Sequence, residues 1–375
     1  MRIRIGVAGL GAVAQSVHLP LILRRWDLFE LVAVADLSPA QSTDVGGQFG
    51  LTPEHCYASL GEMLEAETLD GVFLLTSGSH GAPALECVRR NIAVFCEKPL
   101  ALSLREIDAL SEAEREANRP LLLLAYMKEY DPAVVRLKQR LPEPSEIRYV
   151  NVEVLHPSGQ SQLAYANLRP PAGDIDPATI ARLKAADHAV TTTALGESAP
   201  QAFRDLYSNV ILGSLIHDVS LIRSLFGSIT GIDDVRMWAE QDEPGSIEIS
   251  GTVSEQARIH LHWHYLANYP RYRETVTIHH TTGSFELEFT VPYLLNAPTE
   301  LRIVSSDGVG ESVETVRDVT EAFEQELIAF HAMVVHSVPP PTGTAEGRAD
   351  LVTVQHIAHV LADRQGIPLA GEAGR

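Results

Sequence analysis

Cysteine is scarce in this sequence, since 375 residues include only Cys56, Cys87 and Cys96. An odd number of widely spaced cysteines argues against a disulfide framework and favours a reduced, cytoplasmic protein with buried, inert thiols. A chain of this length can bury a large core without such crosslinks. At roughly 100 to 200 residues per domain, the length predicts two domains.

Long apolar runs and excess positive charge are also missing. No run approaches the roughly 20 apolar residues that span a bilayer, and residues 1–11 read as a strand and a turn rather than as a cleavable leader. Lys and Arg number 29 against 49 Asp and Glu, which gives a formal charge of −20. Such an acidic protein repels nucleic acid and anionic membranes, although backbone dipoles can still hold the phosphates of a cofactor.

The first 125 residues alternate short apolar strands with amphipathic helices. This alternation predicts a parallel sheet with right-handed crossovers, buried on both faces. The expected strands are Ile3–Ala8, Leu31–Ala35, Gly71–Leu75, Val94–Cys96 and Leu121–Ala125, and the expected helices are Val13–Arg24, Pro39–Phe49, Pro83–Arg90 and Leu104–Ala117.

The pattern changes after Tyr130, where strands begin to follow one another with turn signals between them. This predicts an α+β domain with one large, open and mainly antiparallel sheet, so we expect domains at 1–125 and 126–375. The final helix, 345–364, could pack near the first domain. A polar, Pro-rich stretch, 156–204, reads as a long loop that bears on specificity. The expected elements are helices Pro132–Leu141, Leu206–Leu225, Val319–His336 and Ala345–Arg364, with strands Arg148–Leu155, Asp234–Ala239, Ser246–Val253, Arg258–Leu266, Glu274–His280, Ser284–Phe289 and Leu301–Ser305.

A G-x-G-x-x-A fingerprint, Gly9-Leu-Gly11-Ala12-Val13-Ala14, follows the first strand and opens the first helix. Gly9 permits a tight turn, Gly11 lets a pyrophosphate reach the backbone amides, and Ala14 lets the helix sit close to the strand. Ala12 and Val13 would present helix N-terminal amides to the phosphates. The motif alone is weak, because glycine-rich turns are common, but its strand–turn–helix context supports a dinucleotide site.

An acidic residue, Asp36, ends the second strand and strengthens this interpretation. A carboxylate there accepts hydrogen bonds from the adenosine ribose and repels a 2′-phosphate, which favours NAD over NADP. Ser38 or a later basic residue could still tolerate the phosphate. The alternative is a structural turn followed by a chance Asp.

Polar residues also follow the next strands, at the edge where open parallel sheets bind ligands. We expect Thr76, His80, Glu97 and Lys98 to line the cofactor site. Lys98 could stabilise a developing alkoxide or polarise a carbonyl beside the nicotinamide. A surface lysine in a turn is the alternative.

Together these motifs resemble the glucose–fructose oxidoreductase/inositol dehydrogenase (Gfo/Idh/MocA) family. The resemblance extends in order across most of the chain, and Glu-Lys-Pro is its most specific element. The matching segments are Gly9-Leu-Gly11-Ala-Val-Ala14 with His18-Leu-Pro20, Val-Ala-Asp36, Glu97-Lys98-Pro99, Tyr126-Met-Lys-Glu-Tyr-Asp-Pro132 and Ile216-His217-Asp218.

The resemblance implies a Rossmann domain and NAD(P)-linked redox chemistry on secondary hydroxyls of a sugar or cyclitol. It also implies a homodimer or homotetramer built through the C-terminal sheet, a catalytic role for Lys98, and a peptide bond after it that is often cis. A family helix carries Asp and, four residues later, His. His217 matches the histidine as acid–base, but Gly213 occupies the acidic position. Asp218 cannot replace that acid, because adjacent helical residues point about 100° apart.

Further substrate contacts are expected from Tyr126, Lys128, Tyr130, His156 and Asp218. Aromatic and charged side chains suit a polyhydroxylated ligand, whereas a packed hinge between domains is the alternative for the residues after the sixth strand. His217 could likewise be a core histidine of an apolar helix.

Three histidines, His260, His262 and His264, alternate along one expected strand, with His279 and His280 on the next. Period two puts the first three on one face, but imidazoles spaced about 7 Å apart cannot share one ion without help from a neighbouring strand. We therefore expect an exposed or interfacial sheet face and no metal.

The sequence thus predicts an NAD-dependent oxidoreductase that acts on a sugar or cyclitol. Two alternatives stay open. One is an enzyme that cleaves a glycosidic bond through transient oxidation by tightly held NAD. The other is a non-catalytic regulator that senses NAD or a sugar, to which the missing acid at Gly213 lends weight.

Overall fold

The chain folds into two compact units. The computed structural model describes residues 1–170, 172–239, 244–254 and 257–374. The first unit comprises 1–126, 165–194 and 323–348, and the second comprises the remaining segments from 127 to the C-terminus. The sequence places 165–194 and 323–348 in its second domain, whereas their contacts group them with the first unit.

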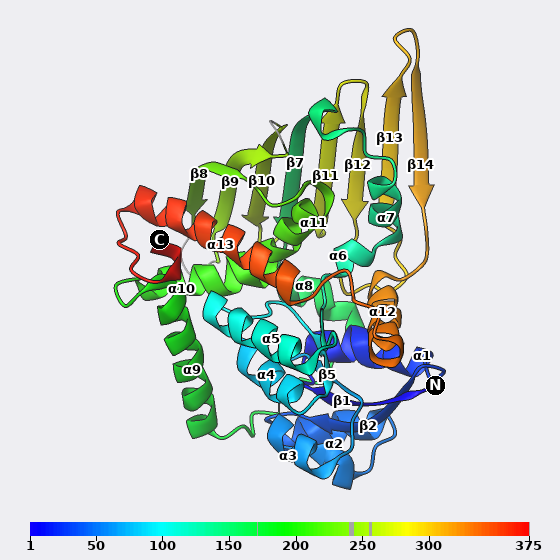
Figure 1. Ribbon diagram of the computed structural model, residues 1–375, viewed down its shortest axis with the longest axis vertical. Coiled ribbons are helices and arrows are strands. Elements are labelled where there is room, and N and C mark those ends of the chain that lie inside the picture. The colour runs from blue at the N-terminus through cyan, green and yellow to red at the C-terminus, as the bar shows by residue number, and fades with distance from the viewer. Residues whose placement is uncertain (171, 240–243, 255–256, 375) are drawn as a thin grey trace. The chain divides into compact units, whose positions relative to one another are not determined.

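A six-stranded, fully parallel sheet forms the centre of the first unit (Figure 1). Its order is β3-β2-β1-β4-β5-β6, which is the doubly wound dinucleotide-binding order. Because the order reverses between β1 and β4, the carboxyl ends of these strands flank the crevice where such sheets bind ligands. The strands are β1 (Ile3–Ala8), β2 (Phe29–Ala35), β3 (Cys56–Tyr57), β4 (Gly71–Leu74), β5 (Ala93–Cys96) and β6 (Leu122–Leu124).

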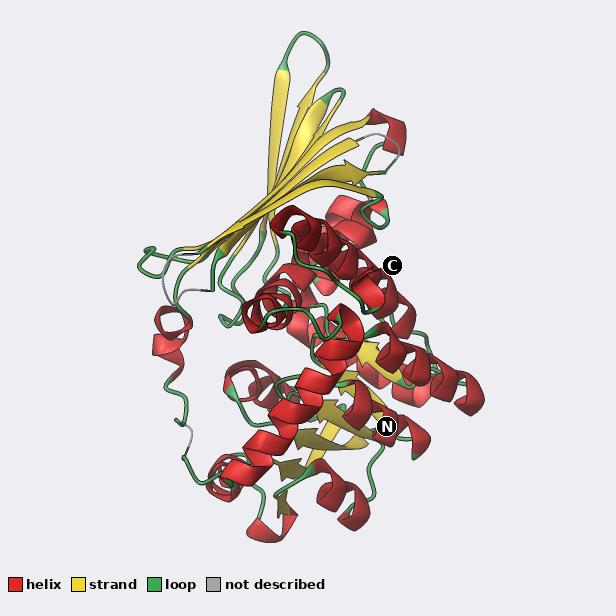
Figure 2. Ribbon diagram, turned by 90° about the vertical axis from the view of Figure 1, so that its left-hand side faces the viewer, coloured by secondary structure: helices red, strands yellow, loops and turns green. Residues whose placement is uncertain are grey.

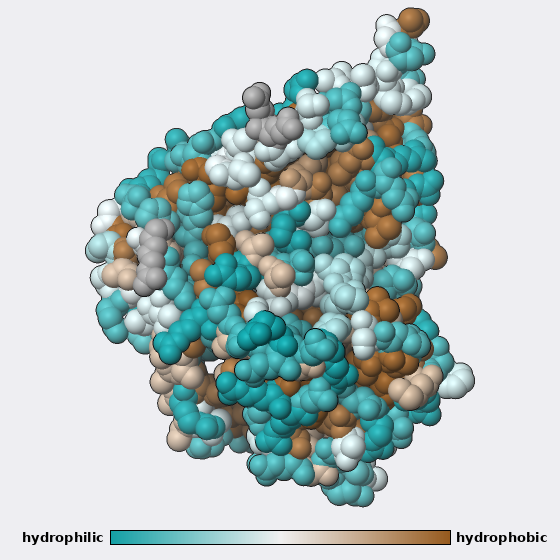
Figure 3. Space-filling view, viewed as in Figure 1, coloured by the Kyte–Doolittle hydropathy of each residue, from teal (hydrophilic) through white to brown (hydrophobic). Residues whose placement is uncertain are grey.

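The helices of this unit begin where the sequence supplies caps. Ser38 accepts a hydrogen bond from Gln41 N at the start of α2, and Ser103 and Glu106 form a capping box at the start of α5. The visible surface over α4 and α5 is mainly hydrophilic (Figure 3). The bounds are η1 (Ala14–His18), α1 (Leu19–Arg24), α2 (Pro39–Gln48), η2 (Pro53–His55), α3 (Leu60–Ala66), α4 (Gly81–Arg89), α5 (Leu104–Ala117), α9 (Pro177–Leu195) and α12 (Ala322–His336).

The first helix is not the regular α-helix expected over 13–24. Residues Ala14–His18 are π-helical, and α-helical bonding resumes over Leu19–Arg24. Pro20 has no N–H for the turn before it, which favours a wider turn at this point.

Phenylalanines from α12 explain why residues 323–348 belong to this unit. The Phe330 ring lies 5.3 Å from that of Phe73 on β4 and 5.8 Å from that of Phe95 on β5. Phe323 packs edge-on against His18, with ring centroids 5.7 Å apart. Tilted and edge-on rings of this kind are favourable beyond the area they bury.

The second unit contains an eight-stranded sheet with the order β14-β13-β12-β11-β7-β10-β9-β8. Only the β7–β10 pair is parallel, so the expected mainly antiparallel sheet is confirmed. Strand β14 was not expected, because its residues are polar and exposed and show no alternation. The strands are β7 (Ile147–His156), β8 (Gly231–Trp238), β9 (Ser246–Val253), β10 (Ala257–Tyr265), β11 (Arg273–His280), β12 (Gly283–Phe289), β13 (Glu300–Ser306) and β14 (Glu311–Arg317).

Among the described residues, helices cover one face of this sheet, and no helix covers the other, bare face (Figure 2). Alternate residues of β10, such as Ile259, Leu261 and Trp263, are buried on the covered face. The helices are α6 (Met127–Tyr130), α7 (Pro132–Lys138), η3 (Pro144–Glu146), α8 (Gly159–Leu163), η4 (Ala164–Ala166), α10 (Gln201–Asp205), η5 (Leu206–Leu215), α11 (Ile216–Phe226), α13 (Thr344–Gln365) and η6 (Glu372–Gly374), with the first turn of α13 in the first unit.

One helical stretch, Gln201–Phe226, is long and apolar enough to cross a membrane by length and composition. More than half of its most apolar window is buried inside the protein. Trp263 on β10 donates a hydrogen bond to Ser214 within this stretch, at 2.9 Å. Its apolar character is therefore accounted for by packing against the sheet.

The expected long loop over 156–204 is wrong. The 19-residue helix α9 occupies Pro177–Leu195, and three shorter helices flank it. Pro177 is its first residue, where a missing N–H costs little, and alanine-rich turns follow. Its polar, weakly amphipathic surface hides it from a search for periodicity.

Candidate functional site

The glycine turn after β1 has the geometry that the fingerprint predicts. Gly9 has a φ of +91°, and a Cβ there would lie 2.6 Å from the backbone of Leu75 and Thr76. A Cβ on Gly11, in contrast, would meet nothing within 4 Å. Ala14 is fully buried. Gly9 is therefore required by the fold, whereas the open space above Gly11 is available to a ligand.

Asp36 is connected directly to this turn. Its Oδ2 accepts a hydrogen bond from Leu10 N at 2.8 Å, and its Oδ1 accepts one from Ser38 N at 2.9 Å. Gln41 donates to the Leu10 carbonyl at 2.9 Å. A carboxylate has about four acceptor positions, so Asp36 can still accept bonds from ribose hydroxyls.

A second carboxylate lies beside Asp36. Asp174 accepts hydrogen bonds from the Ser38 hydroxyl and from Ala40 N, both at the start of α2. These bonds hold the pKa of Asp174 below its ordinary value. The two carboxylates make this end of the crevice unfavourable for another anion.

Asp174 belongs to the segment 165–194, and further hydrogen bonds join this segment to the ligand-binding edge of the sheet. Arg169 N donates to Gln15 at 3.0 Å, and Asp187 accepts from Ser79 N at 3.3 Å, next to the turn after β4. Together with Asp174, these bonds join described residues of this segment to residues that follow β1, β2 and β4. The sequence predicts that 156–204 bears on specificity, but it does not predict where this segment lies.

His80 is buried, and both of its ring nitrogens are bonded to backbone carbonyls. It is 1% exposed, and its two ring nitrogens lie 2.7 Å from the Pro99 carbonyl and 2.9 Å from the Thr76 carbonyl. Burial lowers the pKa of His80, although both carbonyls oppose this effect. His80 therefore joins the loops that follow β4 and β5, while Thr76 itself is exposed.

Glu97 and Lys98 follow β5. Glu97 is hydrogen-bonded to His18, a residue that the sequence does not place in the site. Buried His18 lies with Nε2 3.0 Å from Glu97 Oε1, and Glu97 Oε2 accepts from Lys98 N at 3.1 Å. Burial would raise the pKa of Glu97, but the interactions with His18 and with the charge and amide of Lys98 together outweigh burial and lower it. The Lys98–Pro99 peptide bond is cis. The only sequence signal for His18 is its place in the His-Leu-Pro motif.

The second unit brings Lys128 and Asp218 together with an unexpected partner, Glu274. Lys128 Nζ lies 2.7 Å from Asp218 Oδ1 and 2.5 Å from Glu274 Oε1, and all three residues are at most 4% exposed. Tyr272 donates to Glu274 Oε2 at 2.5 Å. Glu274 could have been noticed from alternation, which places it on the same face as Val276 and Ile278.

Burial and the neighbouring charges together shift the pKa values of Asp218, Lys128 and Tyr272. Burial raises the pKa of Asp218 above its ordinary value, with Lys128 opposing the shift. Burial would lower the pKa of Lys128, but Asp218 and Glu274 outweigh it and raise that pKa. Burial and the nearby carboxylates also raise the pKa of Tyr272 well above its usual value. Lys128 and Asp218 thus satisfy each other inside the unit, and their substrate contact remains a prediction.

His217 lies next to this cluster on a different side of its helix. His217 is half-buried, whereas Asp218 is 2% exposed and bound to Lys128. The expected continuous α-helix over 206–225 is wrong, because η5 is π-helical through Leu215. Gly213 and His217 therefore lie on opposite sides of the change from π- to α-helical bonding, where four-residue spacing no longer defines one regular face. Such π-helical turns are frequent at functional sites.

The three aromatic candidates differ in position. His156 ends β7 in an aromatic cluster, 5.2 Å from the Trp263 ring and edge-on to Tyr272 at 5.8 Å. It therefore lies at the same end of the sheet as Glu274. Tyr126 belongs to the first unit and is 2% exposed, and buried Tyr130 belongs to the second.

Residues 3–124 match the model of the family GFO_IDH_MocA, described as "Oxidoreductase family, NAD-binding Rossmann fold". These residues are similar to the Gfo/Idh/MocA family, and the match covers about a third of the chain. The expected resemblance, the cofactor class and the Rossmann fold are therefore confirmed for this domain.

Curated relatives match part of the chain. The inositol 2-dehydrogenase of Burkholderia ambifaria is 33% identical over 139 residues, which are 37% of this chain and 41% of that protein. The chain thus matches less than half the length of this relative.

Solved structures match nearly the whole chain and show the fold. The UDP-N-acetylglucosamine 3-dehydrogenase of Acidithiobacillus ferrooxidans has a TM-score of 0.68 at 20% identity, over 96% of this chain and 98% of that one. A 3-ketoreductase of Actinomadura kijaniata, in complex with TDP-benzene and NADP, has a TM-score of 0.70 at 16% identity, over 95% and 96%. The two-part α/β and α+β fold class is therefore confirmed.

Proposed function

We propose that this protein is an NAD-dependent oxidoreductase that transfers a hydride between nicotinamide and a secondary hydroxyl or ketone of a sugar or cyclitol. The observation that carries the proposal is the open backbone cradle at Gly11, held to Asp36 through Leu10 N. The inositol and nucleotide-sugar enzymes among its relatives support the substrate class.

The residues at the edge of the first sheet fit a dinucleotide. The backbone from Gly11 to Val13 would hold the pyrophosphate, and Asp36 would accept hydrogen bonds from the adenosine ribose. When bound, the nicotinamide supplies the hydride acceptor or donor. The protein's own contribution is then to orient the substrate carbon and to move the hydroxyl proton.

Discrimination against NADP is part of the proposal. Asp36 and Asp174 lie together at the start of α2, bound to Ser38 N and the Ser38 hydroxyl. Asp174 occupies the hydrogen-bond donors that an added phosphate would need. Two carboxylates at this position would repel a 2′-phosphate and leave the ribose hydroxyls of NAD as the preferred ligand.

We assign the chemical step to Lys98 and His217. Lys98 follows β5 on a backbone held by Glu97, and its ammonium group would stabilise negative charge on the reacting oxygen. His217 would take the hydroxyl proton as hydride leaves, since an imidazole titrates near neutrality. Asp218 does not replace the family acid, because it is bound internally to Lys128.

The test is to incubate the protein with NAD and a panel of sugars and cyclitols and to follow the absorbance of reduced nicotinamide. Lys98→Met should lower turnover at least about a hundredfold while NAD affinity stays unchanged. Lys184→Met is the matched control, because Lys184 is an exposed lysine of α9 in the same unit. Activity in Lys98→Met equal to that of Lys184→Met would refute the catalytic assignment.

A further inference from the structure

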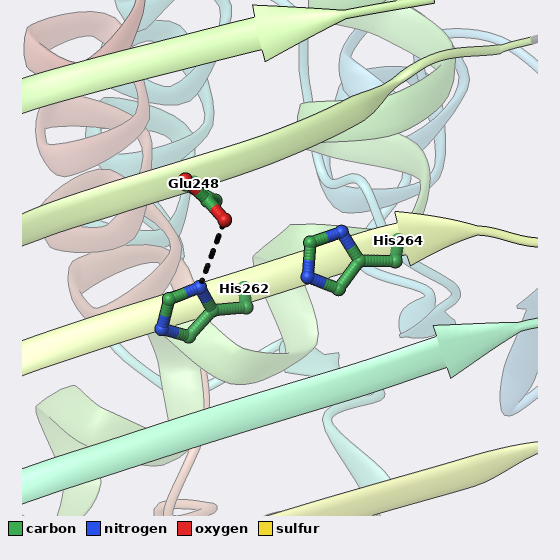
Figure 4. Close-up of side chains that lie close together, drawn as sticks. All are labelled: Glu248, His262 and His264. Atoms are coloured by element: carbon green, nitrogen blue, oxygen red, sulfur yellow. Dashed lines mark ion pairs between the residues drawn. The ribbon is translucent and has the colours of Figure 1, made fainter.

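The bare face of the second sheet brings two histidines to a carboxylate. In the register between β9 and β10, Glu248 lies directly opposite His262. His264 follows two residues later on the same face of β10, because strand residues alternate between faces. Figure 4 shows the three side chains together, with Glu248 on one strand and both histidines on the next.

The distances suit a shared ion. His262 Nδ1 lies 3.6 Å from Glu248 Oε1, and one ligand atom from each of the three residues lies within 4.8 Å of the others. Ligands of a tetrahedral zinc ion, bound at about 2.0–2.1 Å, lie about 3.3 Å apart. The Glu248–His262 pair is already close to this spacing. Rotation of the half-exposed side chains can bring the remaining ligand atoms to the same separation.

Glu248 supplies the neighbouring-strand ligand that three histidines on one strand lack. The spacing along β10 still excludes a site made of His260, His262 and His264 together. His260 lies opposite Ser250 rather than a carboxylate, and its ring stacks on that of His262 at 5.9 Å. The candidate site is therefore the trio of Glu248, His262 and His264.

A further carboxylate on the neighbouring strand adds negative charge beside the trio, which favours a cation. Glu153 on β7 lies opposite His262 on the other side, although it is paired with Arg273.

We propose that Glu248, His262 and His264 bind one divalent transition-metal ion, with zinc as the first choice, through a carboxylate oxygen and two imidazole nitrogens. Two imidazoles and a carboxylate are a common zinc ligand set, and three protein ligands leave a fourth position for water or another ligand. The covered face of the same sheet carries the Lys128–Asp218–Glu274 cluster, because Glu274 pairs with Val154 whereas His262 pairs with Glu153. The two sites therefore use opposite faces.

The experiment is equilibrium dialysis of the full chain against Zn²⁺ in metal-free buffer, followed by titration calorimetry. The wild-type protein should bind one equivalent. Metal affinity falls about 10- to 100-fold even when the lost residue only hydrogen-bonds to a ligand and does not itself bind the metal. Glu248→Gln and His264→Gln should therefore each weaken the binding of Zn²⁺ at least about tenfold. Co²⁺ bound at the same site should give a visible absorption band that Glu248→Gln removes.

His260→Gln is the matched control, since His260 has the same residue type, strand and face but lies outside the trio. Its Zn²⁺ affinity should equal that of the wild type. Absence of saturable binding, or equal loss in His260→Gln and His264→Gln, would overturn the proposal. All four proteins should show the same circular dichroism and melting temperature, because the substituted side chains are not buried.

Discussion

Alanine substitutions at the two glycines of the first turn should have opposite consequences. Gly9→Ala adds a Cβ 2.6 Å from the Leu75 carbonyl carbon and the Thr76 nitrogen, at a residue whose φ is +91°. Gly11→Ala adds a Cβ that meets nothing within 4 Å. The first change therefore disturbs the folded chain, whereas the second only occupies the space expected to receive the pyrophosphate.

The magnitudes follow from these contacts. A left-handed conformation costs an ordinary residue about 1–2 kcal/mol, and the backbone overlap at Gly9 adds to this cost. Gly9→Ala should therefore lower the free energy of unfolding by at least about 2 kcal/mol, or roughly 4–8 °C in melting temperature for a domain of about 150–250 residues. Gly11→Ala should leave stability unchanged or raise it by up to about 1 kcal/mol, because alanine restricts the unfolded chain.

Cofactor affinity separates the two roles. Gly11→Ala should weaken NAD binding at least about tenfold, equivalent to about 1.4 kcal/mol, measured by titration calorimetry on a protein whose urea unfolding curve matches the wild type. If Gly11→Ala binds NAD as the wild type does, the pyrophosphate does not approach this turn and the cofactor assignment fails. If Gly9→Ala is fully stable, the turn geometry described here is wrong.

Two further predictions concern single carboxylates. Asp174→Asn should raise NADP affinity several-fold more than NAD affinity, because it removes a negative charge from the start of α2; equal changes in both titrations would contradict its role in selectivity. Burial raises the pKa of Glu129 from 4.5 to about 7, so the folded state keeps a proton that the unfolded state releases. Its contribution to stability is therefore present below pH 4.5 and is lost as the pH rises towards 7. Between these limits the free energy of unfolding of Glu129→Gln should rise relative to that of the wild type by up to about 3 kcal/mol. Urea unfolding of both proteins at pH 5, 6 and 7 measures this difference. If the difference between variant and wild type is the same at all three pH values, the pKa of Glu129 is not raised.

Local patterns were sufficient for most of the parallel sheet of the first unit. Five of its six strands and the helix Leu104–Ala117 follow from apolar runs, periodicity and caps, each set by neighbours in the chain. The glycine turn and Asp36 were predicted because strand, turn, helix, strand and acid follow one another in order. The cytoplasmic location, the oligomer and the roles of the site residues remain predictions.

Contacts between distant segments could not be read in this way. Helix α9 lacks a strong apolar stripe, and the bonds of Asp174 and Asp187 along the cofactor edge join residues more than 100 positions apart. The same holds for Lys128 with Asp218 and Glu274, because β7 enters the sheet between β10 and β11. The residues within any one of these segments do not indicate which distant segment it contacts.

The sequence alone therefore established the dinucleotide-binding domain and its family motifs, because the information lies in consecutive residues. Tertiary structure decided which charges are paired inside the protein and which carboxylate lies opposite His262, because strand register is chosen by the whole sheet. A shift of one residue in that register would move every side chain to the other face and separate Glu248 from His262.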